Sequence, residues 1–132
     1  MSQENVEAVR RALQTLGTND PDAFIAFCDP QFEMYLVSVV GEPVHYQGPD
    51  GIRQFTRDMR ESWSWFGFEI ESLRDLGDRV LVIGALVGRG RASGVEVASR
   101  RALLIEVRET LLTNVRFFLE VSEALEAVGL AE

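Results

Sequence analysis

Lysine is missing from this 132-residue sequence, and histidine and cysteine occur once each, as His45 and Cys28. Without lysine the chain cannot form a Schiff base or use a phosphate-loop lysine. One histidine and one cysteine cannot make a zinc site, and no loop has the Asp/Asn spacing of a calcium site. A single cysteine also excludes an intrachain disulfide. We therefore expect no metal and no organic cofactor.

Long apolar runs and a basic charge balance are missing as well. No apolar run reaches the roughly 20 residues that a membrane-spanning helix needs, and residues 1–5 lack the basic and apolar regions of a signal peptide. The net charge of −8 argues against nucleic acid, whose binding depends on neutralising phosphates. We expect one domain spanning residues 1–132, located in the cytoplasm, that binds neither nucleic acid nor a membrane.

The stretch between residues 79 and 119 is rich in Val, Leu, Ile and Phe and contains no proline, which is typical of long strands. Upstream, apolar residues recur at helical spacing, Asp20 and Pro21 suit the start of a helix, and Asp29-Pro30 suits its end. Asp50 is expected to cap the next helix. The predicted elements are helices over 3–16 and 21–28, a strand over 31–37, a loop or short strand over 39–47, a helix over 52–63, strands over 68–76, 79–91, 95–108 and 111–119, and a short final helix. Helices set apart from a run of strands indicate an α+β fold, with a curved sheet wrapped around helices.

Several segments carry a family resemblance: ENVEAVRRAL, NDPDAFIAFCDPQFEM, YQGPDGIRQF, GDRVLVIGALVGRGRASGVEV and EALEAVGL. They resemble the SnoaL-like polyketide cyclases of the nuclear transport factor 2-like superfamily, which also contains ketosteroid isomerase, scytalone dehydratase and limonene epoxide hydrolase. The resemblance implies a cone: a strongly curved mixed β-sheet wrapped around N-terminal helices, as in a cystatin-like α+β barrel. Because such relatives include several kinds of enzyme as well as binding domains, the resemblance does not fix a reaction.

The chain departs from these relatives where their catalytic groups lie. Matched to ketosteroid isomerase-like members, the general base falls at Met34, the oxyanion-hole acid at Leu103 and the oxyanion-hole tyrosine at Ala12. Limonene epoxide hydrolase-like members carry Arg-x-Asp, and here Arg101 is present while Leu103 replaces the Asp. Ketosteroid isomerisation should therefore be absent, since apolar groups cannot transfer a proton.

Period-2 alternation divides the predicted strands into two faces. The resemblance places the nearly all-apolar face inside the cone, where Gly84 and Gly88 remove side chains that could fill it. This face is either packed core or the wall of a modest cavity. The candidate ligand-binding residues are Met34, Trp63, Phe66, Leu86, Arg101, Leu103, Ile105 and Phe117.

Three groups could add chemistry to that cavity. Arg101, the one charge on the inward face, either extends its head into water or anchors a carboxylate or oxyanion. His45 and Tyr46 could be supporting residues or an alternative acid/base pair. Trp63, Trp65 and Phe66 either pack on the sheet where a helix ends or form an aromatic rim.

The outward face carries an apolar patch centred on Val87, Leu104 and Phe118, with arginines around it. A patch of this kind usually marks a partner surface, so we expect a homodimer through the outer sheet face. The main functional hypothesis is a protein that binds a small hydrophobic molecule or acts as an accessory protein. The alternatives are a cofactor-free cyclase, isomerase or hydrolase acting on a small apolar substrate, and a dimerisation scaffold with a filled cone.

Overall fold

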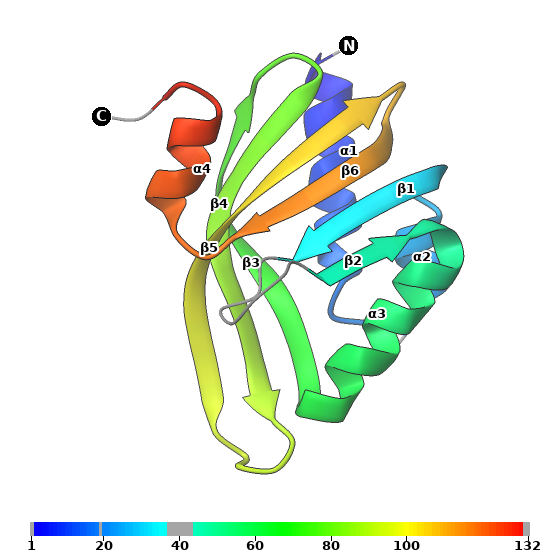
Figure 1. Cartoon of the computed structure of the whole chain (residues 1–132), viewed down its shortest axis with the longest axis vertical. Helices are drawn as coiled ribbons and strands as arrows, with labels where there is room; N and C mark the ends of the chain where they lie inside the picture. The colour runs from blue at the N-terminus through cyan, green and yellow to red at the C-terminus, as the bar shows by residue number, and fades with distance from the viewer. Residues whose placement is uncertain (1, 19, 37–43, 131–132) are drawn as a thin grey trace.

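A curved, unclosed sheet of six strands organises the molecule (Figure 1). The computed structural model describes residues 2–18, 20–36 and 44–130. The elements are α1 (Ser2–Gln14), α2 (Pro21–Ile25), β1 (Cys28–Leu36), β2 (Val44–Gln47), α3 (Gly48–Ser62), β3 (Trp63–Asp75), β4 (Arg79–Gly90), β5 (Glu96–Arg108), β6 (Leu111–Phe118) and α4 (Val121–Ala127). The sheet order is β2-β1-β6-β5-β4-β3; β1 and β6 are parallel, and the other neighbouring pairs among the described strands are antiparallel. The predicted α+β fold with a curved mixed sheet is confirmed.

The three long strands predicted from the apolar stretch are β4, β5 and β6, with ends within one residue of the prediction. The turn between β5 and β6 consists of Glu109 and Thr110, whose φ angles are +52° and +65°. Positive φ at both residues matches the twist of a two-residue hairpin, although neither residue is glycine. The side chain of Asn5 on α1 accepts a hydrogen bond of 3.1 Å from the backbone N–H of Thr110 and ties this turn to the helix.

The second helix begins as predicted and ends earlier than predicted. Asp20 caps it, because its carboxylate accepts a 3.1 Å hydrogen bond from the backbone N–H of Asp22, and Pro21 takes the first turn. The helix ends at Ile25, and Asp29-Pro30 lies inside β1 instead of stopping a helix. The β1–β6 register shifts between Cys28 and Glu33, so the strand tolerates the missing N–H of Pro30 there.

The third helix and the strand after it also differ from the prediction. Gln47 occupies the N-cap position without a capping hydrogen bond from its side chain, and Asp50 lies in the first turn, where it pairs with Arg53 at 3.2 Å. β3 follows at once from Trp63, five residues before the predicted strand start at residue 68. Trp63 and Phe66 pair with Gly90 and Gly88 of β4, so these aromatic residues belong to the sheet. Of the loop or short strand expected over 39–47, residues 39–43 lie outside the described residues, and the rest is β2.

The inward face of the sheet forms the main core with α1, α2 and α3. Its fully buried members include Phe32, Met34, Leu103 and Ile105, as the predicted alternation requires. Burying large apolar side chains stabilises the fold by about 1.5–3 kcal/mol for each one. This core joins the inward face of the sheet to the three helices.

The outward face has a second apolar cluster, and here the prediction of an exposed patch is wrong in part. α4 packs on β5 and β6, and Ala124 from this helix is fully buried. Leu104 and Phe118, predicted to be the centre of a partner surface, are only 5% and 8% exposed. They are covered within the same chain by the final helix, α4 in Figure 1, which packs on β5 and β6. Val87 lies outside this cluster and remains partly exposed.

Candidate ligand pocket in the cone

A pocket of about 190 Å³ remains inside the cone, between α3 and the inward face of the sheet. Eight of its nine lining residues are apolar and the ninth is an arginine. They are Leu16, Leu36, Phe55, Met59, Phe66, Leu86, Arg101, Phe117 and Leu119. Most of this lining comes from residues that also pack on the main core, so the pocket walls are supported from behind.

Four predicted binding residues, Phe66, Leu86, Arg101 and Phe117, line this pocket together. Three others lie deeper: Met34, Leu103 and Ile105 are between 0% and 1% exposed and belong to the packed core. The eighth, Trp63, is outside the lining.

The five remaining wall residues were not predicted. Phe55 and Met59 share one face of α3, and their helical spacing was visible in the sequence. Leu16, Leu36 and Leu119 lie at the ends of elements, where no periodic pattern distinguishes a pocket wall from an ordinary core residue. They are brought together only by the tertiary fold.

The two inward glycines of β4 do not open the cone as expected. A Cβ on Gly84 would meet the carbonyl oxygen of Glu69 and the ring of Phe68. A Cβ on Gly88 would lie 2.8 Å from the ring of Trp63. The space over these glycines is therefore occupied by β3 and its aromatic side chains, which explains why Trp63 packs on the sheet and does not line the pocket. Trp65 points the other way and is 42% exposed.

Arg101 is the one charged residue of the pocket lining. Its Cα pairs with Gly84 on β4, and its Nη1 donates a 2.8 Å hydrogen bond to the carbonyl of Arg100. Within the described part of the chain, no carboxylate lies within ion-pair distance of its guanidinium. The neighbouring Arg100 faces outward and pairs with Glu71 at 3.1 Å. Arg100 and Arg101 thus lie on opposite faces of the sheet.

His45 and Tyr46 also lie on opposite faces, and neither lines the pocket. His45 is exposed, stacks on Tyr35 at 4.4 Å between ring centroids, and places Nε2 3.1 Å from Glu33. This outward position removes it from any chemistry inside the cone.

Tyr46 points inward, packs edge-on against Phe55 and donates a 2.6 Å hydrogen bond to Asp58. Burial, followed by this bond to a carboxylate, raises the pKa of the Tyr46 hydroxyl well above its ordinary value. Hydrogen bonds from Tyr46 and Gln54 lower the pKa of Asp58. The pair joins β2 to α3 and holds Phe55 in the pocket wall.

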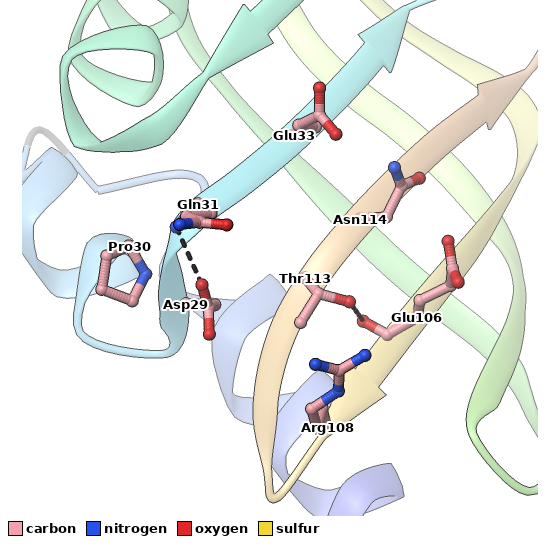
Figure 2. Close-up of a pocket in the computed structure, with 8 residues that line it drawn as sticks. All are labelled: Asp29, Pro30, Gln31, Glu33, Glu106, Arg108, Thr113 and Asn114. Carbon is pink, nitrogen blue, oxygen red and sulfur yellow. Dashed lines mark hydrogen bonds between the residues drawn. The ribbon is translucent and has the colours of Figure 1, made fainter.

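A larger hollow of about 590 Å³ lies on the outward face across β1, β6 and β5 (Figure 2). Its side chains are mostly polar, and three are carboxylates: Asp29, Glu33 and Glu106. It is open to solvent, and its polar groups partly satisfy each other or the backbone, as in the Thr113 hydroxyl bond to the Glu106 carbonyl. Among residues 2–18, 20–36 and 44–130, no group of three or more His, Cys, Asp or Glu side chains is arranged to hold a metal ion. The apolar pocket inside the cone is the better candidate for a small ligand than this more open, polar hollow.

Fold and pocket together define a cone-shaped α+β protein with an apolar cavity between its helices and its sheet. The chain belongs to the SnoaL-like domain family, whose sequence model matches residues 9–115. This confirms the resemblance seen in the sequence. No match was found among curated proteins. None of the helices in the described residues is long and apolar enough to cross a membrane.

Solved structures with the same fold cover nearly the whole chain. A hypothetical protein with a ketosteroid isomerase-like fold from Catenulispora acidiphila, in complex with trimethylamine, has a TM-score of 0.78 at 16% identity, covering 94% of this chain and 93% of its own. TerC, co-crystallised with polyporic acid, has a TM-score of 0.77 at 16% identity, with 96% and 98% covered. A candidate SnoaL-like polyketide cyclase from Jannaschia sp. CCS1 has a TM-score of 0.75 at 18% identity, with 99% and 95% covered. At these identities the similarity shows the fold alone.

Proposed function

We propose that the protein binds a small hydrophobic molecule in the cone pocket, as a binding or accessory protein of the SnoaL-like type. The observation that carries this proposal is the nearly all-apolar lining of the pocket, which has one charged group and comes from six elements and from Leu16 and Leu119 outside them. A concave apolar site with few polar groups is the usual form of a small-molecule site. The trimethylamine and polyporic acid complexes of similarly folded proteins agree with this use of the fold.

The lining offers little for proton transfer. The positions that match the ketosteroid isomerase catalytic groups, Ala12, Met34 and Leu103, are apolar and buried. A cofactor-free cyclase, isomerase or hydrolase would have to work with Arg101 alone among the charged side chains of the lining. Arginine stays protonated and acts as an electrostatic anchor, not as a base. The third hypothesis, a filled cone, is disfavoured by the open volume of about 190 Å³.

A pocket-filling variant tests the binding proposal. Leu86 and Val87 are neighbours on β4 that face opposite sides of the sheet. Leu86→Trp should fill the pocket and abolish the thermal shift and calorimetric signal from single-ring hydrophobes, whereas Val87→Trp should leave both unchanged. Equal binding to both variants, or no binding to the wild type across a panel of neutral and acidic hydrophobes, would refute the proposal. Turnover of a bound compound would favour the enzyme alternative.

We also propose a homodimer through the part of the outer sheet face that α4 leaves uncovered. Trp65, Val87 and Ala98 remain accessible there, on neighbouring strands β3, β4 and β5. Of the predicted centre, Val87, Leu104 and Phe118, only Val87 therefore remains in the proposal. Val87→Glu should give a folded monomer by light scattering, because a charge would have to be buried on association. A wild type that is monomeric at high micromolar concentration would contradict this.

Cytoplasmic location and a single SnoaL-like domain over residues 1–132 remain part of the proposal. Cell fractionation and limited proteolysis test them. Recovery in another fraction, or a stable fragment much shorter than the chain, would count against the respective statement.

A further inference from the structure

Arg101 places a permanent positive charge in an otherwise apolar wall. The wall around this guanidinium supplies no counter-ion. The protein carries 21 acidic residues, yet within the described residues none of them forms an ion pair with this side chain. Nη1 is held by the Arg100 carbonyl, and no acceptor among the described residues takes the donors on Nε and Nη2. A guanidinium with free N–H donors in the wall of an apolar pocket is suited to bind the carboxylate of a ligand.

The pocket also limits the size and shape of the ligand. An apolar cavity of about 150 Å³ in another protein holds benzene, so 190 Å³ suits one ring with a small substituent. Phe55 and Phe66 meet edge-to-face, with ring centroids 6.0 Å apart and an interplanar angle of 87°. Together with Phe117 they give the wall aromatic faces and edges on which a flat ring packs well.

We propose that the ligand is a single-ring aromatic monocarboxylate, with its carboxylate on Arg101 and its ring against Phe55, Phe66 and Phe117. This inference rests on the proposed binding function and adds the chemical class of the ligand. It assigns Arg101 the role of selecting an anion, while the apolar wall supplies the rest of the affinity and sets the size limit.

The test compares two ligands of the same shape, 4-ethylbenzoate and neutral 4-ethylbenzamide, by titration calorimetry at low salt. Wild type should bind the benzoate roughly 10-fold to 100-fold more tightly, the usual effect of one charge-assisted hydrogen-bonded pair. Arg101→Gln should reduce this preference to about 3-fold or less with little effect on the benzamide. Arg100→Gln is the matched control, because that arginine faces outward and pairs with Glu71; it should keep the wild-type preference. A three-ring acid such as 9-anthracenecarboxylate should not bind detectably.

The outcomes separate this inference from the binding proposal beneath it. If the wild type binds benzoate and benzamide equally, or if Arg101→Gln keeps the preference, the anion selection is wrong while the pocket stands. Tighter binding of the three-ring acid would overturn the size limit. If neither single-ring ligand binds and Leu86→Trp behaves as the wild type does, the binding proposal itself fails. Circular dichroism and thermal unfolding check that each variant is folded.

Discussion

Truncating Leu104 to alanine distinguishes a side chain buried under α4 from one on a free surface. Leu104 is 5% exposed, its Cα pairs with Leu81 on one side and Arg116 on the other, and Phe118 belongs to the same cluster. Buried Leu→Ala changes cost about 2–5 kcal/mol, because transfer free energy is lost and a cavity remains. A helix of seven residues can settle partly into that cavity, so we expect about 2–3 kcal/mol.

Equilibrium urea unfolding, followed by circular dichroism at two protein concentrations, measures this loss. For a chain of this length it corresponds to a fall in Tm of roughly 6–12 °C. Val87→Ala is the control on the same face beyond the α4 cluster, and it should cost less than about 1 kcal/mol. The two concentrations separate folding from association, since a dimer's apparent stability depends on concentration. A loss below about 0.5 kcal/mol for Leu104→Ala would mean that α4 does not cover this face in solution.

Four further predictions concern other parts of the molecule. The double variant Glu109→Asn, Thr110→Gly should stabilise the fold by about 1–2 kcal/mol, because asparagine and glycine adopt positive φ with less strain. The urea midpoint should rise with an unchanged dependence of unfolding free energy on urea, and a lower midpoint would refute this. Gly88→Ala should lower the free energy of unfolding by about 1–3 kcal/mol, measured by thermal unfolding, because a Cβ there would meet the ring of Trp63. Gly67→Ala should cost much less, since a Cβ on Gly67 meets nothing closer than 3.9 Å. Equal effects would contradict the packing over Gly88. The lowered pKa of Asp58 stabilises the fold at pH values above the ordinary carboxyl pKa, and this stability is lost as the pH falls through the lowered pKa. Tyr46→Phe should therefore reduce the loss of unfolding free energy between pH 6 and pH 3. An unchanged slope of unfolding free energy against pH would be evidence against the Tyr46–Asp58 pair. Burial raises the pKa of the Cys28 thiol to about 12, so a thiol reagent at pH 8 should react with the unfolded chain much faster than with the folded protein, and similar rates would disprove its burial.

Alternation was enough to predict the long strands and which of their residues face the core. β4 and β5 pair without a break over their whole length, so one parity assignment holds from Arg79 to Arg89. The region around Trp63 was assigned to the end of a helix, but β3 begins at Trp63 and shifts register between Trp63 and Trp65, so Trp63 lies over Gly88 instead of in the pocket. A bulge of this kind leaves no clear mark in a sequence.

The cover on the outward face could not be predicted from the sequence alone. The apolar residues of the final helix, such as Leu125, show that it must pack somewhere, but not on which face of which strands. Leu104 and Phe118 have the same sequence pattern whether α4 or a second chain covers them. The pocket posed the same difficulty, because its unpredicted wall residues Leu16 and Leu119 come from opposite ends of the chain.

The location of a bound ligand tests the central claim most directly. Amide chemical shifts should be followed in ¹⁵N-labelled protein during titration with 4-ethylbenzoate. We expect saturable changes concentrated at Phe66, Leu86, Arg101 and Phe117, all lost in Leu86→Trp. Changes confined to the outward hollow around Glu33 and Asn114, or no saturable change at all, would contradict it.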